Sequence, residues 1–221
     1  MVDWSDMRHL DLKIRPFIFG FVVLIAAGMA GSVAFGQGWR GDVMITVVND
    51  KLVAIPAAGS RIEENLGANE TVQNTAARGQ TGFAQTSTRL LGFSSELRHW
   101  AEVPLGVEET VERRHVQGRL IVAQTTRQVY GFQEGRAHWT SESLGARETV
   151  KQLQGRGHVA VVLTSDRALA FSSYTGGFFS LPWTTDERVL AIDESNDAVM
   201  LRTSARTVVF RSQSTEWVEV R

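Results

Sequence analysis

The stretch that decides the fold is "QVYGFQEGRAHWTSESLGARETV", which runs from Gln128 to Val150. It combines an aromatic-glycine-aromatic segment, one tryptophan and the trio Glu-Thr-Val. A single copy would say little, but the same pattern recurs along the chain. Recurrence at a fixed period is the signature of a repeat architecture, in which each unit covers its apolar side by packing on the next.

The period is 39 residues, and several kinds of position follow it together. One set is phenylalanine, at Phe93, Phe132, Phe171 and Phe210. A second set is aromatic, at Trp100, Trp139, Phe178 and Trp217. A third set is acidic, at Glu70, Glu109, Glu148 and Glu187. An earlier stretch, "GDVMITVVNDKLVAI", aligns with residues 118–132 after a slip of one residue, so the repeat predicts five units between Gly41 and Arg221.

Each unit predicts four short β-strands. In the third unit they are "ETVERRH", "GRLIVAQT", "QVYGFQE" and "RAHWTSESL". β-Branched and aromatic residues fill these segments, and glycine and polar residues separate them. Four strands in a repeat of this length are typical of β-propeller blades. We therefore predict an all-β, five-bladed propeller whose aromatic positions pack between neighbouring blades.

The first unit differs from the others because its Glu-Thr-Val position falls inside an apolar segment. We predict three strands there and four in every other unit. An open edge invites pairing. We expect a closed ring of five blades, in which the first blade either closes without its inner strand or receives that strand from a partner.

The pattern of Val-Tyr-x-Phe or Leu, followed by Gly-x-x-Trp, resembles the quinoprotein-type (PQQ-like) propeller repeats over about 180 residues, from Gly41 to Arg221. That superfamily includes non-enzymatic members, such as the propeller lipoprotein of the outer-membrane β-barrel assembly machinery. The resemblance implies a propeller that serves as a docking surface. Enzymatic members have more blades and hold a quinone with calcium, often over a vicinal cysteine pair. The chain has five units and no cysteine, so we expect no cofactor and no enzyme activity.

Residues 16–39 contain no charged side chain, which is long enough for a helix to cross a hydrocarbon core of about 30 Å. Arg8, Lys13 and Arg15 precede this run and predict a cytoplasmic N-terminus. We expect a cytoplasmic segment at 1–15, a single-pass anchor in a bacterial inner membrane at 16–39, and a periplasmic propeller at 40–221.

A cleaved signal peptide is the alternative for the same run, because the small residues Ser32, Val33 and Ala34 stand near its end. The apolar length and the long preceding segment favour the anchor.

Composition excludes some classes of function. Hydrophobic residues make up 43% and charged residues 21% of the chain, as in ordinary globular proteins. The formal net charge is -1, so the basic field that is typical of nucleic-acid-binding proteins is missing. The absence of cysteine removes disulfides and Cys-type zinc sites.

The repeated glutamates have two interpretations. Arginine stands 19 residues after three of them, as Arg89, Arg167 and Arg206, and Gln128 stands at that offset from Glu109. The set could be a ring of acid–base groups, or a structural Glu–Arg bond that fixes the turns between blades. A catalytic site needs a constellation that breaks the symmetry of the repeat. We therefore expect the structural bond and no catalytic residue.

The histidines predict no metal site. His99 and His138 precede Trp100 and Trp139, so strand alternation points each histidine away from its buried neighbour and toward solvent. The sequence also contains no G-x-S-x-G nucleophile elbow, no P-loop and no dinucleotide-binding fingerprint.

The segment "YTGGFFSLPW", Tyr174 to Trp183, has two interpretations. It is either a hairpin followed by a core strand, or an exposed aromatic anchor at a protein interface. On the second interpretation, the interface residues are Tyr174, Phe178, Phe179 and Trp183.

These observations favour a scaffold subunit of an inner-membrane protein complex, for which a respiratory or photosynthetic complex is one host. Its partners would be protein subunits, and the lipid bilayer through residues 16–39. One alternative is a periplasmic small-ligand or glycan-binding propeller or enzyme, which requires carboxylates and aromatics clustered on one or two blades. Another is an envelope assembly factor, which the missing lipobox cysteine disfavours.

Overall fold

The computed structural model describes residues 42–220, which belong to one compact unit made almost entirely of β-strands. The expectations for residues 1–15 and 16–39 lie outside the described residues. No helix in the described part of the chain is long and apolar enough to cross a bilayer.

In this described part of the chain, nineteen strands form five antiparallel sheets, each built from consecutive strands. Sheet 1 contains β1 (Met44–Val48), β2 (Lys51–Ile55) and β3 (Ile62–Asn65). Sheet 2 contains β4 (Val72–Arg78), β5 (Thr81–Thr86), β6 (Arg89–Ser94) and β7 (His99–Pro104). Sheet 3 contains β8 (Val111–Gln117), β9 (Leu120–Thr125), β10 (Gln128–Gln133) and β11 (His138–Ser143), with the short 3-10 helix η1 (Glu134–Arg136) before β11. Sheet 4 contains β12 (Val150–Arg156), β13 (Val159–Thr164), β14 (Arg167–Ser172) and β15 (Phe178–Pro182). Sheet 5 contains β16 (Val189–Glu194), β17 (Ala198–Thr203), β18 (Thr207–Arg211) and β19 (Trp217–Val220).

The predicted strand pattern is confirmed. Sheets 2 to 5 have the four-stranded antiparallel order of propeller blades, and sheet 1 has three strands. The first strand of each four-stranded sheet carries a register shift at the same place in the repeat, beginning at Val72, Val111, Val150 and Val189. The repeat in sequence is therefore a repeat in backbone geometry.

Neighbouring sheets interlock through an aromatic ring and a small residue. A Cβ added to Gly92 would lie 2.5 Å from the ring of Phe132, and one added to Gly131 would lie 2.3 Å from the ring of Phe171. Each ring is fully buried and also packs on the aromatic residue that follows it in its own sheet, as Phe132 does on Trp139 with centroids 5.1 Å apart. Glycine at these positions lets the backbone of one sheet approach the ring of the next.

Hydrogen bonds from tryptophan side chains to backbone carbonyls also join the outer strands of neighbouring sheets. The Nε1–H of Trp139 on β11 donates to the carbonyl of Ala101 on β7 over 3.0 Å. Trp217 on β19 makes the same bond to Phe179 on β15 over 3.0 Å.

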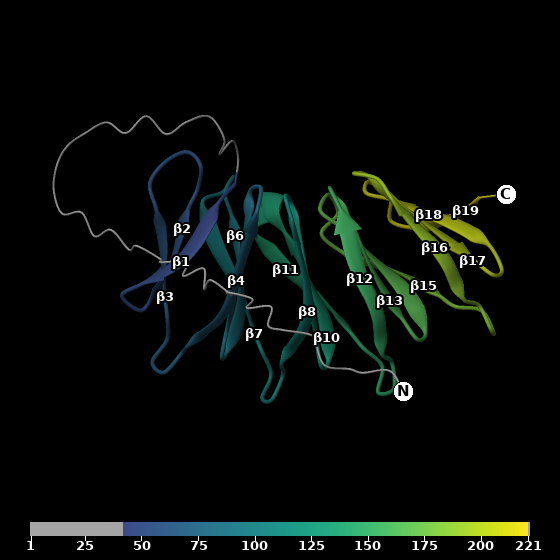
Figure 1. Cartoon of the computed structure of the whole chain (residues 1–221), viewed down its shortest axis with the longest axis horizontal. Helices are drawn as coiled ribbons and strands as arrows, with labels where there is room; N and C mark the ends of the chain where they lie inside the picture. The colour runs from purple at the N-terminus through teal and green to yellow at the C-terminus, as the bar shows by residue number, and fades with distance from the viewer. Residues whose placement is uncertain (1–41, 221) are drawn as a thin grey trace, which may run out of the picture. The chain divides into compact units, whose positions relative to one another are not determined.

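The five sheets follow one another in chain order, and close packing joins only consecutive sheets (Figure 1). Within the described residues, no strand of sheet 1 packs closely on a strand of sheet 5, and the two lie at opposite ends of the row. The closed five-bladed ring that the sequence predicted is therefore not formed here.

Burial shows the same difference between the inner sheets and the end sheets. Every residue of β5, β9 and β13 is buried, because a neighbouring sheet covers each face. The equivalent strand of sheet 5, β17, alternates between buried and less buried residues, and β1 is mostly exposed. Each end sheet is therefore covered on one face.

Candidate functional site

The repeated glutamates lie at the connections between consecutive sheets, where each is held by a set of hydrogen bonds that we call a latch. The Glu70, Glu148 and Glu187 carboxylates each accept a bond from an arginine Nε, at 2.8, 2.8 and 3.0 Å, from Arg89, Arg167 and Arg206. The same arginines also donate to the backbone carbonyl of the last residue in the preceding sheet. These residues are Asn65, Ser143 and Pro182. Each latch therefore ties the connection between two sheets to both of them.

In two of the latches, hydrogen bonds to the glutamate lower its pKa by more than burial raises it. Burial alone would raise the pKa of Glu187, but the backbone N–H of Thr184 and the side chains of Arg206 and Thr203 hold that pKa at about 2. Arg89, Thr86 and the Gly67 backbone likewise overcome burial and hold the pKa of Glu70 at about 2. A carboxylate that stays ionised at neutral pH is unsuited to donate a proton.

The latch at Glu109 is built differently because Gln128 replaces the arginine. Glu109 is buried and accepts a bond from Thr125, from the Gly106 backbone and from the Tyr130 hydroxyl, the last at 3.2 Å. Burial, together with the charge of Glu109, raises the pKa of Tyr130 to about 12. Tyr130 thus stays protonated and stabilises Glu109 as a hydrogen-bond donor.

The histidines that the structure describes do not gather into a site. His99 and His138 are exposed beside buried Trp100 and Trp139, as strand alternation predicted. Burial lowers the pKa of His115 on β8. Across residues 42–220, no three His, Asp or Glu side chains gather closely enough to hold a metal ion.

The four residues of the possible aromatic interface do not form one exposed cluster. Tyr174 is exposed and stacks on His158. Phe178 packs on Phe171, Phe179 packs on Phe210 of the next sheet, and the Nε1–H of Trp183 donates to the Thr164 carbonyl over 3.1 Å. Their contacts within and between sheets half-bury Phe178, Phe179 and Trp183, which matches the hairpin-and-core interpretation.

A cleft that sequence reasoning missed opens between sheets 4 and 5. It has a volume of about 600 Å³ and is lined by the first strands β12 and β16, the end of β13 and Trp183. The first strands of sheets 2 and 3, and of sheets 3 and 4, pack closely on each other, whereas β12 and β16 do not. One sequence signal points to this difference, because Gln152 stands where Arg113 stands one repeat earlier.

Comparison with models of known protein families finds no family that matches the chain, and comparison with curated proteins finds no relative. Solved structures with a similar arrangement of strands include the N-terminal domain of Nup159, at 10% identity and a TM-score of 0.34 over 80% of this chain and 57% of that one. HIRA(644–1017) is similar at 19% identity and a TM-score of 0.41, over 64% of this chain and 50% of that one. Yeast RCC1 (Prp20) with bound Kap60 is similar at 9% identity and a TM-score of 0.38, over 76% of this chain and 54% of that one. The chain thus spans about half the length of these propeller-like structures.

Proposed function

We propose that this chain is a non-enzymatic docking subunit of a bacterial inner-membrane complex, such as a respiratory or photosynthetic complex. Residues 16–39 would hold it in the bilayer, and its run of blades would bind periplasmic parts of partner subunits. Membrane confinement raises the local concentration of the blades at their partner, so a modest interface suffices. The observation that carries the proposal is the incomplete first sheet.

Among residues 42–220, sheet 1 has no counterpart of the strand that stands first in sheets 2 to 5. β1 occupies the place of the second strands β5, β9, β13 and β17, and among the described strands none pairs with its other edge. Its sequence, "MITVV", contains no charge or proline of the kind that protects an edge strand. Met44 and Val48 are 49% and 43% exposed. An extended segment of a partner subunit can add to such an edge through backbone hydrogen bonds.

The outward face of sheet 5 is a second surface that no described sheet covers, and it carries exposed valines beside Arg202 and Arg211. Val218 and Val220 on β19 are about half exposed. Val209 stands where the inner sheets have Gly92, Gly131 and Ala170, so this face lacks the small residue that receives a ring. Two different surfaces at separate sheets suit a protein that joins other proteins.

The glutamates support this proposal over an enzyme or glycan receptor. Each of the four is held by hydrogen bonds, and the further carboxylates near Glu70 and Glu148 are paired with the same arginines, Arg89 and Arg167. The cleft between sheets 4 and 5 has one aromatic lining residue, Trp183, and its only carboxylate, Glu187, is bonded to Arg206. A glycan-binding site would instead gather several carboxylates and aromatic side chains on one or two blades.

The test is purification of the full chain from gently solubilised membranes through a C-terminal tag. We expect the unmodified chain to bring partner subunits with it. The double variant with Met44→Lys and Val48→Lys places two charges on β1. We expect this double variant to lose at least one partner. Val107→Lys is the matched control, because Val107 is 84% exposed and lies in a turn between sheets 2 and 3.

Three outcomes would overturn the proposal. The unmodified chain could purify alone, or the β1 variants could retain every partner. The chain could also purify with copies of itself only, which would make sheet 1 a self-association surface.

A further inference from the structure

In the described part of the chain, the side-chain bonds that join the first strands of sheets 3 and 4 have no counterpart between β12 and β16. Between sheets 3 and 4, Arg113 donates to the Val150 carbonyl over 3.1 Å, and Gln117 donates to the Gly155 carbonyl over 3.3 Å. At the position equivalent to Arg113, Gln152 donates instead to Gln154 of its own strand. The space between the two first strands is therefore left open.

The floor of the cleft is apolar. Leu163 of β13 is buried, and Trp183, Val189 and Ile192 are half-buried around it. Leu190 lies at the register shift between Val189 and Ala191 and is 66% exposed beside this floor. The fold thus leaves room for a bulky apolar group from another molecule, and offers it an exposed leucine.

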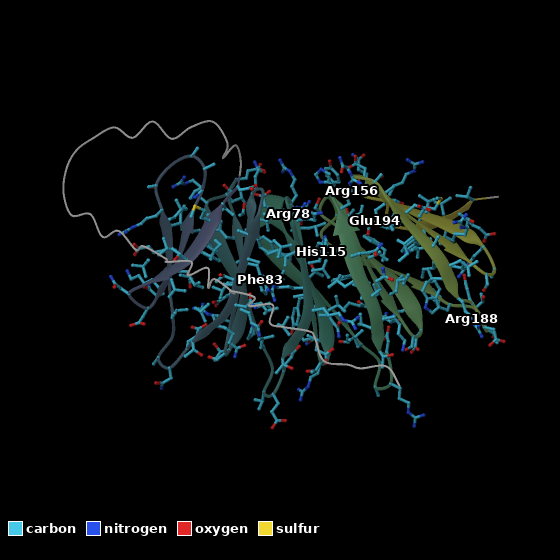
Figure 2. All side chains as sticks on the ribbon, viewed as in Figure 1. Arg78, Phe83, His115, Arg156, Arg188 and Glu194 are labelled. Carbon is cyan, nitrogen blue, oxygen red and sulfur yellow. The ribbon has the colours of Figure 1, made fainter. Side chains whose placement is uncertain are left out.

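The rim of the cleft is cationic. Lys151 is the second residue of β12, Arg188 immediately precedes β16, and both are exposed. In the described part of the chain, no carboxylate lies within 4.0 Å of either side-chain charge. The one acidic lining residue, Glu187, is neutralised by Arg206. Figure 2 places Arg188 at one end of β16 and Glu194 at the other, so the cationic rim lies away from the acidic end of that strand.

The remaining lining groups suit a polypeptide. Gln152, Gln154 and Ser165 offer amide and hydroxyl groups that can both donate to and accept from a peptide backbone. β12 and β16 are each the first strand at one side of their sheet, so each has an edge that no described strand covers. A fatty acid or lipid tail could make no hydrogen bond to these groups, whereas a peptide backbone could.

We propose that the cleft between β12 and β16 binds an extended acidic peptide segment that carries a bulky apolar side chain. The apolar side chain packs on Leu163, Trp183 and Ile192, and the flanking carboxylates pair with Lys151 and Arg188. This site is separate from the edge of β1, so it extends the proposed docking function to a second partner segment.

The test measures fluorescence anisotropy of a labelled synthetic peptide, with one leucine among glutamates, as the detergent-solubilised full chain is added. We expect saturable binding that weakens as salt is added, since the rim charges are exposed. Lys151→Glu with Arg188→Glu is expected to weaken binding by about tenfold or more, because attraction at the rim becomes repulsion. Arg202→Glu with Arg211→Glu is the matched control, because both arginines are exposed on the outward face of the same sheet.

Several results would overturn the proposal. They are no binding by the unmodified chain, equal loss in the control pair, equal binding of a peptide with serine in place of leucine, or equal binding of single-stranded DNA of the same charge. A photoreactive leucine in the peptide gives a readout that needs no variant. Its crosslinks are expected on β12, β16 or Trp183, and crosslinks confined to other strands would also overturn the proposal.

Discussion

Glu187 shows how one residue of the repeat holds two sheets together. Its carboxylate accepts bonds from Arg206, Thr203 and the Thr184 backbone, and its pKa falls from an ordinary 4.5 to about 2. A carboxyl with a depressed pKa in the folded state stabilises the fold fully above its unfolded pKa. That contribution is lost as the pH falls through the folded pKa.

Glu187→Gln should therefore destabilise the fold most at neutral pH. We expect its deficit in unfolding free energy, measured by urea denaturation, to shrink steadily as the pH falls from about 4.5 toward 2, because the wild-type carboxylate becomes protonated over that range. Glu216→Gln, at an exposed carboxylate without an ion pair among the described residues, is the control and should cost little at any pH. A deficit for Glu187→Gln that stays constant down to pH 2 would contradict the latch.

At the scale of strands, the tryptophans provide a matched pair. Trp139 on β11 is buried and donates to the Ala101 carbonyl on β7. Trp100 on β7 is buried at the equivalent position, but its Nε1–H has no partner among the described residues. The tryptophan of β11 therefore links the outer strands of sheets 3 and 2, whereas the tryptophan of β7 keeps an unpaired donor.

We expect Trp139→Phe to cost more stability than Trp100→Phe, by about 1 kcal/mol in unfolding free energy. Both substitutions remove similar apolar area, but only the first breaks a bond and leaves a carbonyl unpaired. Chemical denaturation of the two variants under identical conditions measures the difference. Equal losses, or a larger loss for Trp100→Phe, would show that the bond between β11 and β7 adds nothing.

The sequence predicted these strands well because each depends on local alternation and on glycine at fixed places. The 19-residue offset also predicted the latches at Glu70, Glu148 and Glu187. The cleft was not predicted, since it depends on whether Gln152 reaches the next sheet or its own strand. Ring closure was wrong because it depends on angles between sheets that add up over the whole row, and no single repeat position encodes them.

At the scale of the whole row of sheets, stability should follow position. In repeat proteins each unit is stabilised mainly by its nearest neighbours, so an end unit has one stabilising interface and an inner unit has two. β9 and β13 are buried at every residue, whereas β1 is mostly exposed and β19 has no fully buried residue. Within the described residues, no sheet packs on the outward faces of sheets 1 and 5 to offset the entropy of ordering these strands.

Native-state hydrogen exchange of the full chain, followed by mass spectrometry, tests this gradient. We expect amides of β9, β10, β13 and β14 to exchange last, with opening free energies near that of global unfolding. Amides of β1 and β19 should exchange first, through openings confined to sheets 1 and 5. A partner that adds a strand to β1 should slow exchange in sheet 1 and leave sheet 5 unchanged, because the two sheets share no close packing in the described residues. Uniform protection across all five sheets would mean that the ends are covered, and that the row behaves as one closed cooperative unit.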